Sequence, residues 1–223
     1  MSALIRPREI LNRYADARDW CRITNRDDGS VSVYLYDEIG VFGTTAQEFV
    51  GQLQDIDAGA IDLHINSLGG SVFDGIAIYQ ALRAHPAQVT VKVDAMAASI
   101  ASVIAQAGDR RLMVRHSQMM IHEAHGLGLG KAEDLRGLAD VLDKQTDTIA
   151  RIYADRNGGG VRKFLEMMRA ETWFSDKEAV AAGLADEVHT PPAKSTQEPE
   201  PVAARVDWGA FLEDVSPLEG IRL

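Results

Sequence analysis

The sequence predicts an α/β protein, and three observations favour that class. Between residues 31 and 108, segments with alternating apolar residues are each followed by a segment with helical apolar spacing. Residues 132–157 form a longer helical pattern with a one-sided apolar stripe. Five of the seven prolines lie in residues 190–223, which sets the end of the folded body. Alternating strands and helices in one body indicate an α/β fold.

The expected elements follow one another in regular order. VSVYLY at 31–36 alternates as a strand does, and TTAQEFVGQLQDI at 44–56 has a threonine cap and helical spacing. We expect further strand and helix pairs at 61–66 with 71–85 and at 89–95 with 99–108, then two short strands in RRLMV and MMIH.

The long helix expected at 132–157 needs a surface to pack against. Its stripe consists of Leu135, Leu138, Leu142, Ile149 and Ile152, and Asn157-Gly158 is a helix stop signal. At a rise of ~1.5 Å per residue, such a helix is about 39 Å long. It either packs on its own domain or protrudes and packs on another subunit.

Three parts are expected along the chain. Residues 1–19 form a helical lead-in, residues 20–189 form the body, and residues 190–223 form a proline-rich linker with a short tail. The tail places apolar residues at helical spacing, namely Trp208, Phe211, Leu212 and Val215. This pattern suits a helix docking in a groove of the body or of a partner, and the alternative is a disordered remnant.

Composition excludes several classes of function. The chain has 223 residues, 46% of them hydrophobic, and a formal charge of −10, which does not suit nucleic-acid binding. Cys21 is the single cysteine, so an intrachain disulfide cannot form. Neither a signal peptide nor an apolar run long enough to span a membrane is evident. We expect a cytoplasmic protein without nucleic-acid or membrane partners.

INSLGGSVFDG, residues 65–75, joins an expected strand to an expected helix through two glycines. Adjacent glycines permit positive φ and leave N–H groups uncovered, and such a turn before a helix binds negative charge, such as a phosphate or an oxyanion. The alternative is a plain tight turn.

DAMAASIAS, residues 94–102, places serines among small residues where a strand becomes a helix. Small neighbours leave room for a substrate above Ser99, and the Ile100 N–H is expected to converge with the glycine turn. A hydroxyl with two convergent N–H donors forms an acyl-transfer site. The alternative is that Ser99 only caps the helix. Ser102 is expected to be a packing residue.

MMIHEAHGLGLG, residues 119–130, supplies a candidate base. His122 ends an apolar strand, where it is either structural or the base for a serine nucleophile. Zinc binding by His122 and His125 lacks a nearby cysteine or third histidine, so we expect no metal and no cofactor. The segment that follows lacks every second side chain and is either a strand that pairs with an extended peptide or a flexible loop: Gly126, Leu127, Gly128, Leu129 and Gly130.

AETWFSDKEAVAAGLADEV, residues 170–188, supplies the candidate acid. Glu171 precedes an aromatic pair and a capping pattern, Ser175 to Glu178, and its carboxylate is placed to orient the histidine. Asp176 and Asp186 are rival candidates.

These four motifs, in this order and spacing, resemble those of the ClpP peptidase family. INSLGGSV is similar to the family's Asn-Ser-Pro-Gly-Gly turn, AMAASIAS to its nucleophile segment and MIHEA to its histidine segment. ETWFSDKEAVAAGLAD is similar to its acidic segment, with glutamate where the family usually has aspartate. The resemblance runs from about Ile65 to Val188 and more weakly back to Val31.

The resemblance implies a ClpP/crotonase-type fold of repeated ββα units with a protruding handle helix. It implies Ser99 as nucleophile, His122 as base and Glu171 as third triad member, with an oxyanion hole from the N–H groups of Gly69 and Ile100. It further implies a serine endopeptidase that cleaves polypeptides inside a homo-oligomeric ring, a hexamer or heptamer, single or stacked. Residues 126–130 would pair with substrate, and the 132–157 helix would join two rings.

Two departures bear on these expectations. Leu68 replaces the usual proline, which the glycines tolerate, and the N-terminal region does not resemble the housekeeping peptidase's axial loops. The resemblance is nearer to phage and prophage ClpP-like proteases of head maturation. The expected partner is therefore an ATPase unfoldase or a capsid or scaffold protein. The alternatives are an inactive ClpP-like assembly scaffold and a crotonase-like acyl-CoA enzyme.

Overall fold

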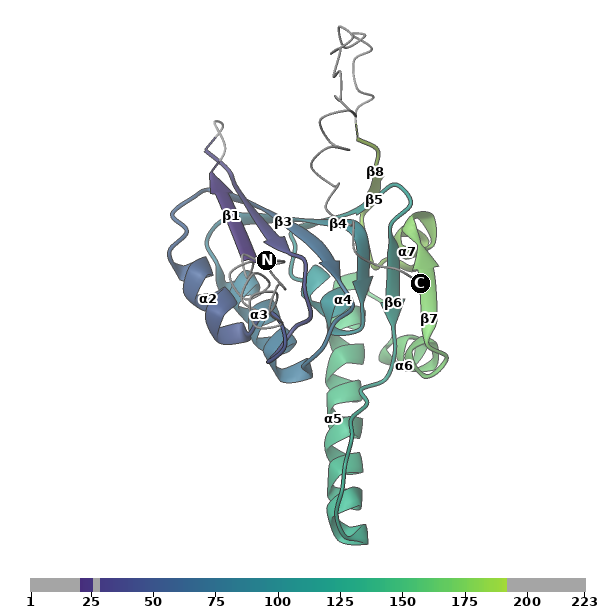
Figure 1. Ribbon diagram of the computed structural model, residues 1–223. Helices are drawn as coiled ribbons and strands as arrows, with labels where there is room; N and C mark the ends of the chain where they lie inside the picture. Colours follow the sequence, from purple (N-terminus) through teal and green to yellow (C-terminus); the bar gives the residue numbers. More distant parts are fainter. Residues whose placement is uncertain (1–20, 26–28, 192–223) are drawn as a thin grey trace, which may run out of the picture. The chain divides into compact units, whose positions relative to one another are not determined.

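The computed structural model describes residues 21–25 and 29–191, and these residues form a sheet covered by helices (Figure 1). The described sheet runs in the order β1-β2-β3-β4-β5-β8, while β6 pairs with β4 and β7. β1 and β7 pair antiparallel to their neighbours, and the other ladders are parallel. The predicted α/β class is confirmed.

The elements have the following bounds. The strands are β1 Cys21–Asn25, β2 Val31–Leu35, β3 Ala60–Ser67, β4 Gln88–Ala98, β5 Arg110–Val114, β6 Gln118–Ile121, β7 Thr172–Ser175 and β8 Glu187–His189. The helices are α2 Ala46–Gln54, α3 Val72–Ala84, α4 Ile100–Ala105, α5 Ala132–Asn157, α6 Val161–Arg169 and α7 Asp176–Ala182. The predicted strands and helices between residues 31 and 157 are all present, while β1, α6, β7 and β8 were not predicted as such.

Alternation along β3 divides the sheet into an apolar face and a polar face. Ile61, Leu63 and Ile65 are buried, and they share the core with residues of α2 and α3, which cover that face. Between them, Asp62 and His64 lie on the opposite face. The predicted threonine cap of α2 is Thr45, whose side chain accepts the Glu48 N–H.

β4 pairs with two different strands along its length. Its first half is in register with β5, from Thr90 opposite Arg110 to Val93 opposite Met113. Its last residues turn to β6, ending with Ala98 opposite Met120. The carboxyl ends of β4 and β6 therefore meet, and the chain leaves both strands at the same place.

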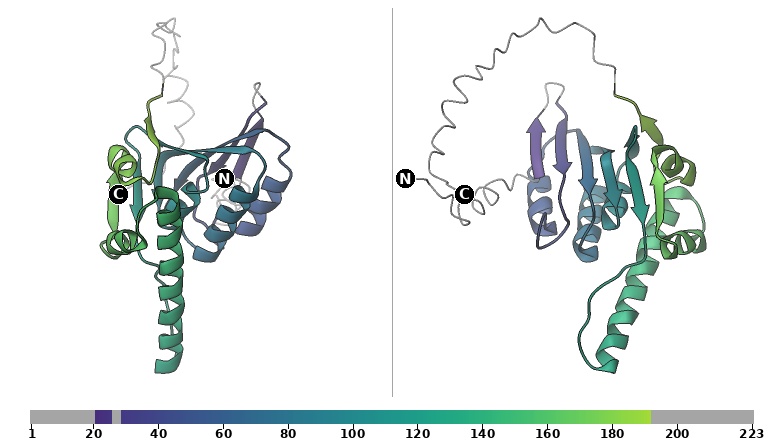
Figure 2. Two further views of the ribbon diagram at one scale, coloured as in Figure 1. Left: turned by 180° about the vertical axis from the view of Figure 1, so that it is seen from behind. Right: turned by 45° about the vertical axis from the view of Figure 1, so that its right-hand side comes forward.

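α5 begins and ends where the sequence predicts, and Gly158 caps it with a φ of 69°. The chain between β6 and α5 runs beside the helix (Figures 1 and 2). A Cβ on Gly128 would lie 2.4 Å from Leu138 Cδ2 and 3.3 Å from Leu135 Cδ2. The missing side chains let this segment approach the leucine stripe, so part of the stripe packs within its own chain.

The predicted lead-in at 1–19 and the predicted tail helix lie outside the described residues. The residues up to Pro191 belong to one compact unit, and the predicted boundary at residue 190 stays a prediction. Among the described helices, none is long and apolar enough to cross a membrane.

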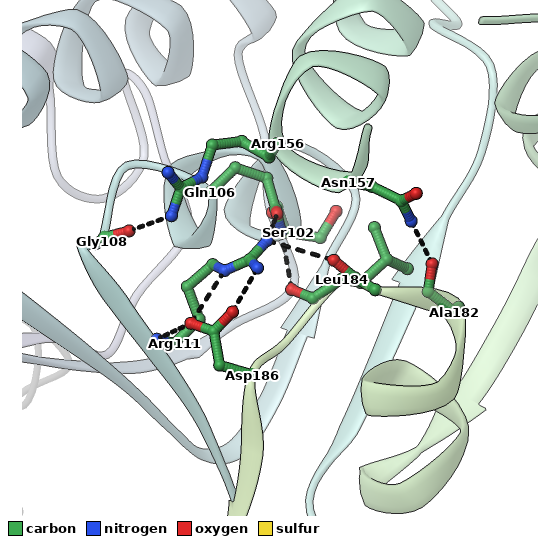
Figure 3. Close-up of polar contacts among 10 residues, drawn as sticks. Ser102, Gln106, Gly108, Arg111, Arg156, Asn157, Ala182, Leu184 and Asp186 are labelled. Carbon is green, nitrogen blue, oxygen red and sulfur yellow. Dashed lines mark hydrogen bonds and ion pairs between the residues drawn. The ribbon is translucent and has the colours of Figure 1, made fainter. Parts of the chain in front are cut away.

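An ion pair between the buried Arg111 and the partly exposed Asp186 connects β5 with the chain before β8 (Figure 3). The Arg111 guanidinium binds the Asp186 carboxylate and donates to Gln106 Oε1 at 2.7 Å and to the Gly183 carbonyl at 3.2 Å. Arg111 is only 6% exposed. A buried cation of this kind is stable only with its partners in place, so this network holds the end of α4 against the α7–β8 loop.

Replacing Arg111 by methionine should lower the free energy of unfolding by about 2–4 kcal/mol, because the Asp186 carboxylate and the Gln106 amide lose their partner. The matched control is Arg162→Met, which removes an exposed pair with Glu166 at 3.0 Å. It should cost less than about 0.5 kcal/mol. Urea denaturation at one protein concentration measures the free energy of unfolding of both variants. Equal losses in the two variants would contradict the stabilising role of the Arg111 network.

Candidate active site

Ser99 lies between β4 and α4 in an unusual backbone conformation, with φ 55° and ψ −129°. Such a conformation costs a non-glycine residue on the order of 1–3 kcal/mol and is held by surrounding contacts. The Ser99 N–H donates to the Met120 carbonyl at 2.9 Å. The Ser99 side chain makes no capping hydrogen bond to α4, so the interpretation of this serine as a simple helix cap is wrong.

His122 follows β6 and reaches Ser99 directly. Its Nε2 lies 2.7 Å from Ser99 Oγ, within hydrogen-bond distance. This contact follows from the β4–β6 ladder, which brings the residues after both strands together. The structure thus joins two residues that the sequence marked separately as nucleophile and base.

The glycine turn lies against the Ser99 turn. Gly69 and Gly70 have φ values of 96° and 146°, where side chains are strained. A Cβ on Gly69 would lie 2.7 Å from Ser99 Cβ and 3.1 Å from Ile100 N. Only a glycine can approach the serine this closely.

The Gly69 N–H is already engaged, because it donates to Ser67 Oγ at 3.1 Å. The Ser67 hydroxyl in turn donates to the Asp37 carbonyl. The structure therefore differs from the prediction that Gly69 offers a free donor. Gly70, the next residue, lines the cavity together with Ser99 and Ile100, and no partner for its N–H is found among the described residues.

A cavity of about 360 Å³, including its open mouth, lies beside Ser99 and His122. Apolar side chains line part of it, and they come from three helices: Val72 of α3, Val103 of α4, and Ile149 and Tyr153 of α5. An apolar recess next to a nucleophile and N–H donors suits a substrate side chain held beside a scissile carbonyl.

Burial lowers the pKa of His122 below its usual range, and the neighbouring His125 adds to this lowering. The two imidazole rings are 4.7 Å apart in an edge-to-face arrangement. The Glu171 carboxylate opposes the shift but does not outweigh it. A lowered pKa keeps the imidazole neutral near pH 7, which is the form that accepts a proton.

Glu171 lies near His122 but does not bind it. The β6–β7 ladder ends with Ile121 opposite Thr172, and Glu171 lies in the turn just before β7 with a φ of 49°. Among the described residues, neither ring nitrogen of His122 has a hydrogen bond to this carboxylate. The rival acids are engaged elsewhere, since Asp176 accepts the His116 N–H and Asp186 binds Arg111.

Comparison with known proteins identifies the family. The model of the Clp protease family matches residues 16–192. The chain belongs to the Clp protease family. It is 33% identical over 179 residues to the ATP-dependent Clp protease proteolytic subunit of Deinococcus radiodurans, covering 74% of this chain and 88% of that protein.

Two further proteolytic subunits with the same name are similar. The protein of Bacteroides fragilis is 32% identical over 165 residues, covering 69% of this chain and 80% of that protein. The protein of Chlorella vulgaris is 34% identical over 128 residues, covering 56% of this chain and 64% of that protein. The predicted family, fold type and class of serine peptidase are confirmed, and the phage-like subtype stays a prediction.

Pairing of residues 126–130 with a substrate strand stays a prediction. No strand is assigned among Gly126, Leu127, Gly128, Leu129 and Gly130, and the two leucines are fully exposed. Among the described residues, no group of three or more His, Cys, Asp or Glu side chains could hold a metal ion.

Three contributions to the site were not predicted from the sequence: the N–H of Gly70, the side chain of Tyr153 and the hydroxyl of Ser102. Tyr153 is four residues after Ile149 on the same face of α5, and this spacing was the available signal. Ser102 is fully buried, as a packing residue is, but its hydroxyl also hydrogen-bonds Tyr153 Oη at 2.8 Å.

The pKa of His122 is expected to respond to its two charged neighbours in opposite directions. His125→Gln should raise this pKa because a like charge is removed, and Glu171→Gln should lower it because an opposing carboxylate is lost. Histidine ring chemical shifts recorded across a pH titration report both changes without any substrate. A shift of the same sign in the two variants would contradict the arrangement.

Proposed function

We propose that this chain is a serine endopeptidase that hydrolyses peptide bonds inside a homo-oligomeric ring, with Ser99 as nucleophile and His122 as general base. The observation that carries the proposal is the 2.7 Å contact between Ser99 Oγ and His122 Nε2 beside the cavity. Family membership and the names of the proteolytic subunits of similar sequence support the same chemistry.

In the proposed reaction, Ser99 Oγ attacks the scissile carbonyl carbon while His122 Nε2 takes the hydroxyl proton. The carbonyl oxygen becomes an oxyanion bound by the N–H groups of Ile100 and Gly70, the latter in place of the predicted Gly69. His122 then gives the proton to the leaving amine, and an acyl group stays on Ser99. Water, deprotonated by His122, attacks the acyl carbon and frees Ser99.

Glu171 is proposed to complete the triad. For Nε2 to accept a proton, Nδ1 must carry one, and a carboxylate that accepts from Nδ1 fixes this tautomer. The Glu171 carboxylate is near enough to oppose the lowering of the His122 pKa, and its longer side chain has the freedom to reach Nδ1 in another rotamer.

The contact between Ser99 and His122 also weighs against the two alternatives. An inactive assembly scaffold has no need for a nucleophile at hydrogen-bond distance from a base in a cavity. A crotonase-like acyl-CoA enzyme would use the glycine turn without these two side chains. The partner predicted from sequence, an ATPase unfoldase or a capsid or scaffold protein, stays a prediction, as does a cytoplasmic location.

A fluorophosphonate probe tests the nucleophile. One adduct per chain is expected by intact mass, and it should map to Ser99, because phosphonylation requires an activated hydroxyl beside a base. Ser99→Ala should show none, while Ser117→Ala, the control, changes a buried serine just before β6 and should be labelled like the wild type. Absence of an adduct on the assembled wild-type protein would overturn the proposal.

Ring stacking is proposed to bury the exposed leucines beside α5. Leu127 and Leu129 are about fully exposed in the single chain, at 103% and 102%. Leu127→Asp with Leu129→Asp should therefore yield a smaller assembly by native mass spectrometry, since charges resist burial. Leu127→Met with Leu129→Met keeps the apolar area and should keep the wild-type mass. An unchanged mass for the aspartate variant would exclude this interface.

A further inference from the structure

Two buried hydroxyl groups lie directly beneath the Ser99 turn. One belongs to Ser102 of α4 and the other to Tyr153 of α5, and the two oxygens are 2.8 Å apart. Ser102 is 0% and Tyr153 1% exposed. Buried hydroxyls need partners, so this hydrogen bond is retained in the folded protein.

The Ser99 carbonyl oxygen, at the end of this chain of hydrogen bonds, determines which hydroxyl donates and which accepts. Ser102 Oγ also contacts the Ser99 carbonyl oxygen, which can only accept, so the Ser102 hydroxyl donates to it. The Ser102 oxygen is then the acceptor for the Tyr153 hydroxyl. Burial raises the pKa of Tyr153 above its usual range, so the phenol keeps the proton that it donates.

This chain of hydrogen bonds ends on the peptide unit that also carries the Ile100 N–H. The Ser99 carbonyl and the Ile100 N–H belong to one planar trans peptide and point in opposite directions. Anchoring the carbonyl on its buried side therefore aims the N–H at the other side, where Ile100 and Gly70 line the cavity. The positive φ of Ser99, 55°, makes such an anchor necessary, because the turn is strained.

We propose that the hydroxyl groups of Tyr153 and Ser102 are positioning groups that hold the Ile100 N–H toward the oxyanion formed at Ser99. This inference rests on the proposed peptidase function and goes beyond it, since it makes α5 a support of the oxyanion hole.

The C-terminal end of α4 is held by other hydrogen bonds. The placement of α4 can therefore be separated from the positioning of the Ile100 N–H. Gln106 Nε2 donates to the Ser102 carbonyl at 3.0 Å and to the Leu184 carbonyl at 3.2 Å, and Arg111 holds the Gln106 amide oxygen (Figure 3). These contacts leave the Ser102 hydroxyl untouched. The Ser99 carbonyl also accepts the Ser102 backbone N–H at 3.0 Å. Loss of the hydroxyl pair should therefore remove one of the two donors to this carbonyl and loosen the Ser99–Ile100 peptide unit while α4 stays in place.

The test compares the full-length wild-type protein with Tyr153→Phe, Ser102→Ala and the double variant. The rate of phosphonylation by a fluorophosphonate, followed by intact mass, should fall about tenfold in each single variant, because the phosphonyl oxygen occupies the oxyanion position. The double variant should be no slower than either single variant, since both changes break one chain of hydrogen bonds. In cleavage of a short fluorogenic peptide, kcat should fall while KM stays unchanged.

Tyr34→Phe is the matched control, because it removes a phenol hydroxyl from a ring that stacks on His64 on the polar face of the sheet. Its phosphonylation rate should equal that of the wild type. Wild-type rates in Tyr153→Phe and Ser102→Ala would overturn the inference while leaving the proposed function intact, and so would multiplicative losses in the double variant. An unlabelled wild-type protein would overturn the proposed function and the inference with it.

Discussion

The parallel pairing of β4 with β6 is the constraint on which the site depends. The register ends with Ala98 opposite Met120, and the Ser99 N–H extends it by binding the Met120 carbonyl. His122 then follows β6 at the distance from which Nε2 meets Ser99 Oγ. A slip of one residue would turn every side chain of β6 to the other face and remove His122 from the serine.

Close backbone approach is the second constraint, and it accounts for the small residues around Ser99. A Cβ on Gly70 would lie 2.1 Å from the Ile39 carbonyl oxygen, and one on Gly75 would lie 2.1 Å from Ile100 Cγ1. Ala97 and Ala98 are fully buried before the serine. Three segments thus converge where larger side chains have no room, and the hydroxyl at their junction stays reachable from the cavity.

Much of this arrangement could be predicted from the sequence, for reasons specific to each segment. The bounds of α5 are clear because a long apolar stripe ends at Asn157-Gly158. Ser99 could be predicted because small residues surround it, and His122 because it ends an apolar strand. β7, at four residues, is too short to show a periodic pattern. The choice between Gly69 and Gly70 depends on the Ser67 hydroxyl, and the role of Ser102 depends on Tyr153, 51 residues away, so neither follows from local pattern.

A crystal structure of the assembled protein after reaction with a peptide boronate, which forms a tetrahedral adduct on an activated serine, would test the site most directly. We expect boron bonded to Ser99 Oγ, one boronate oxygen within hydrogen-bond distance of both the Ile100 and the Gly70 nitrogens, and the peptide side chain in the apolar recess. A boronate bound elsewhere, or one whose oxygen contacts neither nitrogen, would contradict this arrangement.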